Sequence, residues 1–330
     1  MRAELIKRKE VVGVWTEKDR VVVGTRNQAD YEAAILKSIV PMKIEQKRTE
    51  IRIIGEITAP PPSGKPKAIE PKAVDRTNKI RPAPPGCSTG HVDITAGTLG
   101  GVFTLNGETV ILSNNHVFAN SNAGAKGDWI LQPGPYDING PIPPIPDCPI
   151  ANAVAKIANI PAWILRRDSR LKAYRPTTKK DLEEYLIAYL EDFEPIDFSG
   201  GYNYIDAAIA MPLDPSHVTN EILELGYATG FGRAEIGMPV VKSGRTTGIT
   251  RGTIDAVDGL IKISYGSGRI AIFANQIITT KILEGGDSGS LVGEDKDPLK
   301  IIGLGFAGSD DLSVVNPIGY VLERWPMEIA

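Results

Sequence analysis

The sequence predicts a mainly β fold of the barrel or sandwich type, preceded by a small α/β unit and interrupted by a helical segment. Short apolar runs broken by glycine recur from residue 86 onward, and such regular short strands and turns favour barrels or sandwiches over a parallel sheet. A proline-rich stretch separates these runs from the first 57 residues. The length of 330 residues fits roughly two domains, each able to bury its own core.

Residues 1–57 are expected to form the α/β unit. Two β-branched runs, at 11–15 and 20–24, are separated by a polar turn, which predicts a hairpin. Apolar positions then recur at helical spacing over 31–38, and the alternation over 49–57 predicts a further strand. None of these residues carries recognisable catalytic chemistry, so we expect this unit to have a structural or regulatory role.

Residues 58–85 are rich in proline and are predicted to be an extended linker, which leaves 86–330 as the main domain. Asn-Gly at 106–107 stands between two apolar runs and is a strong hairpin signal. A helical insertion is predicted at about 161–192. There a helix-start pattern at 176–181 precedes apolar residues at i, i+3, i+4 and i+7, namely Leu182, Tyr185, Leu186 and Tyr189.

Composition narrows the class of protein. The net charge of −3 gives no basic face for nucleic acid, and no apolar run approaches the ~20 residues that cross a bilayer. The charged N-terminus lacks the apolar stretch of a secretory signal. Two cysteines, Cys87 and Cys148, are too few for a disulfide framework and could form at most one pair. We therefore expect a cytoplasmic protein without nucleic-acid or membrane partners; self-association stays open.

Residues 284–292 are the stretch around which the chemistry is organised, because three glycines there surround Ser288. Glycine permits a sharp turn that can expose the serine oxygen and aim consecutive backbone N–H groups at a point above it. That arrangement suits an oxyanion hole. A hydroxyl is a weak nucleophile, so the interpretation also requires a base and a group that orients the base.

His116 is the best candidate for the base among three histidines. It stands at the end of the second strand of the hairpin at 106–107, where a side chain can be held rigidly at a cleft, whereas His91 precedes the strands and His217 lies in a turn. Taken alone, His116 would more often be an ordinary structural histidine. Its significance comes from its combination with the other residues.

Asp206 is the preferred orienting acid. It leads into small apolar residues at 207–210, and a carboxylate in such surroundings is costly to bury unless it is hydrogen-bonded. The main rival is Asp197, which leads into a glycine-rich loop.

The order His116, Asp206, Ser288, with Gly-Asp-Ser-Gly-Ser around the serine, resembles the chymotrypsin-like (trypsin-fold) serine proteases over about residues 86–325. This resemblance implies a double six-stranded β-barrel and a catalytic triad of these three residues. It also implies an oxyanion hole formed by the N–H groups of Gly286 and Ser288. With its N-terminal unit and the motif at 244–248, the chain looks most like the bacterial branch of trypsin-like peptidases related to the plant narrow-leaf protein.

The resemblance also places a substrate pocket, with Ile282 near its base and Phe306, Ala307 and Gly308 along one wall. No acid stands at the base, so small or medium apolar residues are expected in preference to Arg or Lys. Many relatives are activated when a new N-terminus pairs with the aspartate before the serine. No activation sequence is found at 80–95, so we expect Asp287 to be satisfied internally, without proteolytic activation.

Two function classes follow. The first is a serine endopeptidase that acts through an acyl-enzyme on protein or peptide substrates, without a cofactor or metal. The second is a catalytically weak or inactive module of the same fold that binds peptides or acts as a scaffold. A metal-dependent hydrolase has little support, because the three histidines are scattered and no His-Glu-x-x-His pattern occurs.

Overall fold

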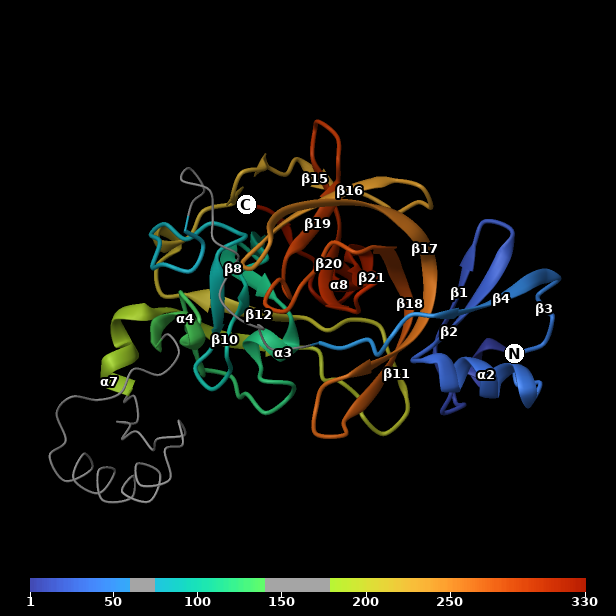
Figure 1. Cartoon of the computed structure of the whole chain (residues 1–330). Coiled ribbons are helices and arrows are strands. Elements are labelled where there is room, and N and C mark those ends of the chain that lie inside the picture. Colours follow the sequence, from blue (N-terminus) through green and yellow to red (C-terminus); the bar gives the residue numbers. More distant parts are fainter. Residues whose placement is uncertain (60–74, 140–178) are drawn as a thin grey trace, which may run out of the picture.

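The computed structural model describes residues 1–59, 75–139 and 179–330, and it consists mainly of β-strands in two large curled sheets (Figure 1). The predicted mainly β fold is therefore confirmed. Few helices accompany the sheets: α1 (Arg2–Leu5), α2 (Gln28–Leu36), α3 (Asn115–Phe118), α4 (Pro135–Asn139), α7 (Lys179–Leu182), α8 (Ile318–Arg324) and the 3-10 turns η1 (Glu183–Tyr185) and η2 (Pro215–His217). None of the helices in these described ranges has the length and apolar character required to cross a membrane.

The first sheet has eight strands in the order β22-β7-β8-β12-β10-β9-β5-β6. Asn106 and Gly107 connect β7 to β8 with positive φ angles of 52° and 87°, the backbone that a two-residue hairpin turn requires, so the predicted hairpin is confirmed. The strands are β5 (Ser88–His91), β6 (Gly97–Thr98), β7 (Gly101–Leu105), β8 (Glu108–Ser113), β9 (Trp129–Leu131), β10 (Leu186–Phe193), β12 (Ala208–Pro212) and β22 (Glu328–Ile329).

The second sheet contains six strands that close on themselves, because β18 pairs with both β17 and β21. In ring order they are β16 (Pro239–Gly244), β17 (Gly248–Ser264), β18 (Ile270–Thr280), β21 (Leu312–Pro317), β20 (Lys300–Gly308) and β19 (Leu291–Glu294). A six-stranded barrel is thus present here, whereas the pairings among the described strands leave the first sheet open. Short strands β11 (Tyr202–Asn203) and β15 (Gly230–Phe231) add to the second sheet, and β13 (Glu221–Ile222) pairs with β14 (Gly226–Tyr227).

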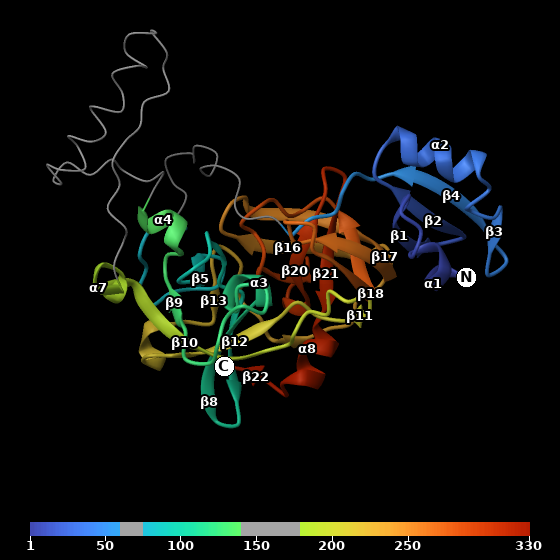
Figure 2. The ribbon, with the colours of Figure 1, turned by 90° about the horizontal axis from the view of Figure 1, so that it is seen from below.

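The N-terminal unit extends the second sheet, because β1 pairs with β17 through Gly13 opposite Ile261 and Val14 opposite Leu260. It contains the predicted hairpin, β1 (Val11–Glu17) and β2 (Arg20–Thr25), followed by α2, β3 (Lys43–Ile44) and β4 (Lys47–Ile53). Figure 2 shows this unit outside β17 and β18, at the end of the molecule opposite β8 and β10. A core cluster joins Trp15 and Ile57 to Phe273 and Phe306, so the unit shares both a sheet and a core with the barrel.

The described part of the predicted linker packs against the rest of the chain. Arg76 is buried and donates hydrogen bonds to Ser243 Oγ at 2.7 Å and to the Gly86 carbonyl at 3.1 Å. Ala83 forms a bridge with Val218. Residues 75–85 are therefore fixed against both sheets, and residues 60–74 lie outside the described residues.

The predicted helix at 161–192 needs correction. Residues 161–178 lie outside the described residues, only Lys179–Leu182 are α-helical, and Leu186–Phe193 form strand β10. This strand lies between β9 and β12 and pairs with both. The ladder hydrogen bonds on both sides outweigh the helical spacing of Leu182, Tyr185, Leu186 and Tyr189, which is only a local preference.

Candidate active site

The turn that carries Ser288 depends on two glycines. Gly286 and Gly289 have φ angles of +95° and +97°, a region that residues with a Cβ rarely adopt. A Cβ on Gly289 would also lie 2.2 Å from Ser113 Oγ and 2.3 Å from the Thr98 carbonyl oxygen. The turn is therefore closed around Ser288, which is 5% exposed, just before β19 begins.

Asp287 is satisfied inside the chain, as expected from the sequence. Its Oδ2 lies 3.0 Å from Lys242 Nζ, and both side chains are fully buried. Its Oδ1 accepts the backbone N–H groups of Thr246 and Thr247 at 2.8 and 3.1 Å. Burial lowers the pKa of the Lys242 ammonium, against the opposing effect of Asp287. Lys242 carries no distinguishing sequence signal, because a lysine inside an apolar strand can also be an edge residue facing water.

The pairing of β8 with β12 brings His116 and Asp206 together. Ser113 lies opposite Ala208 in this antiparallel ladder, so the residues just beyond the paired ends meet. His116 Nδ1 lies 2.6 Å from Asp206 Oδ2, and the His116 backbone N–H donates to Oδ1 at 3.1 Å. The rival carboxylate, Asp197, instead accepts hydrogen bonds from its own loop at Ser199.

Asp206 has further partners that the sequence analysis missed. The Tyr265 hydroxyl donates to Asp206 Oδ2 at 2.7 Å, and its ring meets the His116 ring edge-on with centroids 6.0 Å apart. Asn114 Nδ2 donates to the Asp206 carbonyl, and the Asp206 N–H donates to Asn316 Oδ1, both at 2.7 Å. Burial, and then the charge of Asp206, raise the pKa of the Tyr265 phenol well above its ordinary value. Three groups therefore bond the carboxylate, namely the His116 ring, the His116 backbone N–H and the Tyr265 hydroxyl, while Asn114 and Asn316 fix the Asp206 backbone.

Ser288 and His116 line one cavity of about 390 Å³, together with Ala59 and Tyr265. The Ser288 hydroxyl donates to the Phe306 carbonyl at 3.2 Å. Within the part of the chain that the structure describes, the buried His116 Nε2 has no hydrogen-bond partner. The structure therefore joins His116 to Asp206 directly and places Ser288 on the same cavity wall, without a hydrogen bond between Ser288 and His116.

The backbone N–H groups of Gly286 and Ser288 are oriented by the carbonyls that share their peptide planes. The carbonyl preceding Gly286 accepts a hydrogen bond from Thr246 Oγ1 at 2.8 Å. The carbonyl preceding Ser288 accepts from Ser290 Oγ at 2.6 Å and from the Ser290 N–H at 3.0 Å. In a trans peptide the N–H points opposite to the C=O, so fixing these two carbonyls fixes both N–H directions.

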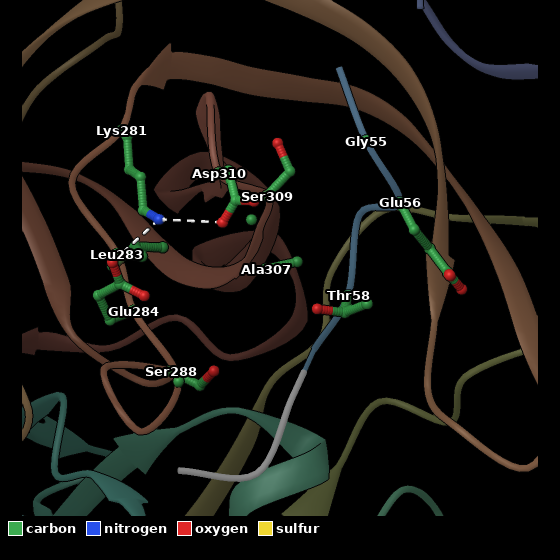
Figure 3. Close-up of a pocket in the computed structure, with 12 residues that line it drawn as sticks. Gly55, Glu56, Thr58, Lys281, Leu283, Glu284, Ser288, Ala307, Ser309 and Asp310 are labelled. Carbon is green, nitrogen blue, oxygen red and sulfur yellow. Dashed lines mark ion pairs between the residues drawn. The ribbon is translucent and has the colours of Figure 1, made fainter. Parts of the chain in front are cut away.

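The expected pocket residues separate into two pairs. Ala307 and Gly308 line a second cavity beside Ser288, of about 240 Å³ (Figure 3). Ile282 and Phe306 do not line it, because they are 1% and 0% exposed and belong to core clusters. Lys281 and Leu283, on either side of Ile282, line this cavity, whereas the Ile282 side chain packs into a core cluster.

Charged residues that the sequence analysis missed also line this second cavity. Lys281 lies 2.9 Å from Glu284 and 3.7 Å from Asp310, as the dashed lines in Figure 3 show. Thr58, from the predicted linker, lines the opposite side. No sequence signal identifies these residues, because they stand in the connections between strands.

Cys87 is buried as a free thiol, and burial raises its pKa to about 12. Cys148 lies outside the described residues.

The sequence matches no protein-family model and no curated protein. Among solved structures, the chain is similar to a glutamic acid-specific serine protease, with 15% identity over 75% of this chain and 100% of that one, at a TM-score of 0.45. It is also similar to Nocardiopsis protease, with 16% identity, coverage of 74% and 96%, and a TM-score of 0.45. Thermobifida fusca protease A gives 15% identity, coverage of 74% and 97%, and a TM-score of 0.45.

Proposed function

We propose that this chain is a serine endopeptidase in which Ser288 is the nucleophile, His116 the general base and Asp206 the group that orients the base. The observation that carries the proposal is the 2.6 Å contact of Asp206 with Nδ1 of a histidine whose other ring nitrogen has no partner among the described residues. Ser288 lines the cavity that His116 also lines.

The tautomer of a neutral His116 ring follows from its partner. An ionised carboxylate can only accept hydrogen bonds, so Nδ1 must carry a proton to bond Asp206. In a neutral imidazole the second nitrogen, Nε2, then has a free lone pair. Such a nitrogen can accept a proton from a hydroxyl in the cavity and return it to a leaving group. Asp206 in turn stabilises the imidazolium that forms.

Ser288 reaches His116 in this proposal by rotation about its Cα–Cβ bond. Its hydroxyl is bonded to the Phe306 carbonyl at 3.2 Å, a contact long enough to exchange for another staggered position. Hydrogen bonds between catalytic groups are often loose before substrate binds and shorten in the complex. We infer that a bound peptide favours the rotated hydroxyl.

The reaction then proceeds in two stages. Ser288 Oγ attacks the peptide carbonyl while His116 takes the hydroxyl proton, and the carbonyl oxygen becomes an oxyanion. The N–H groups of Gly286 and Ser288 bind that oxyanion, each worth about 3–4 kcal/mol in comparable sites. The proton passes from His116 to the leaving amine as the C–N bond breaks. Water, activated in the same way, hydrolyses the acyl-enzyme and frees Ser288.

Membership of the chymotrypsin-like family, and of its bacterial branch related to the plant narrow-leaf protein, stays a prediction from the sequence. The side-chain preference does as well. Ala307 and Gly308 leave room beside Ser288, but Lys281, Glu284 and Asp310 give the same cavity a charged lining, so the apolar preference expected from the sequence has no support there.

Hydrolysis of a mixed-sequence peptide library tests the proposal. The unaltered chain should cleave, Ser288→Ala should not, and Ser216→Ala, an exposed serine in the η2 turn, should cleave at the original rate. If the folded unaltered chain binds peptides but cleaves none, the peptide-binding module becomes the better description. Equal cleavage by Ser288→Ala would refute the role of Ser288.

A further inference from the structure

We propose that residues 55–59 occupy the peptide-binding edge of the candidate active site, in the position and direction that an extended substrate would take. The segment would then compete with substrates within the same molecule. This inference rests on the proposed function, because it names the surface along which that function's substrate binds.

The segment pairs with β20 as an added strand. The Thr58 N–H donates to the Gly308 carbonyl at 3.1 Å, and the Gly308 N–H donates to the Thr58 carbonyl at 3.0 Å. The pairing is antiparallel. On its other side the segment meets the end of β17, where the Ala59 N–H donates to the Ser264 carbonyl at 3.1 Å and the Ser264 N–H to the Ile57 carbonyl at 2.9 Å.

This edge of β20 is otherwise open beside Ser288. On this side β20 pairs with β19, and the hydrogen bonds of that pairing end at Gly305, whose N–H donates to the Ser290 carbonyl. The next carbonyl along, that of Phe306, accepts the Ser288 hydroxyl and so faces the nucleophile. An unpaired strand edge next to a nucleophile is where an extended peptide can add itself as a strand. Thr58 occupies this edge through its two backbone hydrogen bonds with Gly308.

The direction of the segment leads toward the candidate triad. Because Thr58 runs antiparallel to β20, Ala59 lies beyond Gly308 on the side of Ala307 and Ser288. Thr58 lines the cavity that includes Ser288, Ala307 and Gly308 (Figure 3). Ala59 lines the cavity that includes Ser288 and His116. A substrate that extends along β20 must therefore displace these residues.

The segment is held by burial as well as by hydrogen bonds. Ile57 is fully buried in the core cluster that includes Phe306 and Tyr265, and Ala59 is 9% exposed. Release of the segment would free the edge at Gly308 but expose Ile57. We infer that the segment lowers the apparent affinity for extended peptides and leaves small esters, which do not reach Gly308, unaffected.

Two substrates and three variants of the full chain test the inference. Thr58→Pro removes the N–H that donates to Gly308 and should raise kcat/KM for an internally quenched peptide library about three- to tenfold. The ratio of this value to kcat/KM for p-nitrophenyl acetate, a small ester that does not extend to Gly308, should rise by the same factor. Ile57→Val, a milder change that weakens the burial, should act in the same direction. Ala34→Gly, which loosens the same N-terminal unit within α2 away from both cavities, should change neither rate.

An unchanged or lower ratio of peptide to ester activity in Thr58→Pro and Ile57→Val would overturn the inference. If Thr58→Pro does not fold, Ile57→Val alone decides. Should no variant hydrolyse either substrate, the proposed function fails, and binding then tests the inference separately. A fluorescein-labelled hexapeptide with the sequence of residues 54–59 should bind Thr58→Pro/Ser288→Ala about three- to tenfold more tightly than Ser288→Ala. Equal binding would overturn the inference.

Discussion

The Tyr265 hydroxyl and the His116 imidazole donate to the same carboxylate oxygen, Oδ2 of Asp206, at 2.7 and 2.6 Å. Asp206 is fully buried, so these two donors and the His116 backbone N–H replace the water that an exposed carboxylate would have. Tyr265 directly follows β17, at the start of the connection to β18, and lies far from His116 in the sequence. It therefore couples the second sheet to a histidine and an acid held by the first.

Tyr265→Phe tests this coupling. The variant removes one of the donors that fix the Asp206 carboxylate, and with it part of the orientation of the His116 ring. A hydrogen bond to a charged group is worth about 1.5–3 kcal/mol, so kcat should fall roughly ten- to hundredfold while KM changes little, because the lost contact is to Asp206. Tyr320→Phe removes a hydroxyl bonded to Asn275 outside the site and should leave kcat and KM unchanged. An unchanged kcat in Tyr265→Phe would reduce Tyr265 to a packing residue.

Lys242→Met should strongly destabilise the protein. The variant leaves the buried carboxylate of Asp287 without its cation, which costs about 3–5 kcal/mol in comparable pairs. The matched control is Lys126→Met, because Lys126 pairs with Glu191 at the surface with 71% of its side chain exposed, and such pairs contribute about 0–1 kcal/mol. Urea unfolding measures both. Equal losses would show that Asp287 does not depend on Lys242.

Two glycine substitutions separate backbone strain from steric overlap. Gly289→Ala combines a φ of +97° with a Cβ placed 2.2 Å from Ser113 Oγ. Backbone strain alone costs about 1–3 kcal/mol, and we expect the free energy of unfolding of this variant to fall by more than that. Gly107→Ala has a φ of +87° but open space around its Cβ, so only strain should appear. Thermal unfolding of the two variants gives the comparison. A Gly289→Ala protein as stable as Gly107→Ala would contradict the closed serine turn.

The attachment of the N-terminal unit should weaken in acid. Burial raises the pKa of Asp258, but the Thr16 N–H at 2.9 Å and Arg2 at 2.6 Å outweigh it and hold the pKa below its ordinary value of 3.8. A lowered folded-state pKa contributes stability that is present above 3.8 and is lost as the pH falls through the folded value. Asp258→Asn should therefore flatten the acid side of the stability curve, measured by urea unfolding. A parallel curve for the variant would exclude this role.

Local sequence signals predicted the elements that depend on local chemistry. Asn106-Gly107 predicted a hairpin, and its positive φ angles are those the turn needs. The small apolar residues after Asp206 indicated a buried, hydrogen-bonded acid, and Asp206 rather than Asp197 contacts His116.

The errors and omissions arise where distant segments decide the outcome. Leu186–Phe193 have helical spacing, yet β9 and β12 supply ladder partners on both sides and make this segment a strand. Tyr265 and Thr58 reach the site only because the second sheet closes and β1 docks on β17. The residues that flank Tyr265 and Thr58 in the sequence form no pattern that would predict these contacts.

The central claim is that His116 and Asp206 activate the hydroxyl of Ser288. Mass spectrometry of the folded protein after reaction with a fluorophosphonate measures this most directly. We predict one adduct per chain, located on Ser288, absent in Ser288→Ala and formed far more slowly in His116→Ala. A folded chain that forms no adduct, or one whose labelling persists without Ser288, would contradict the account.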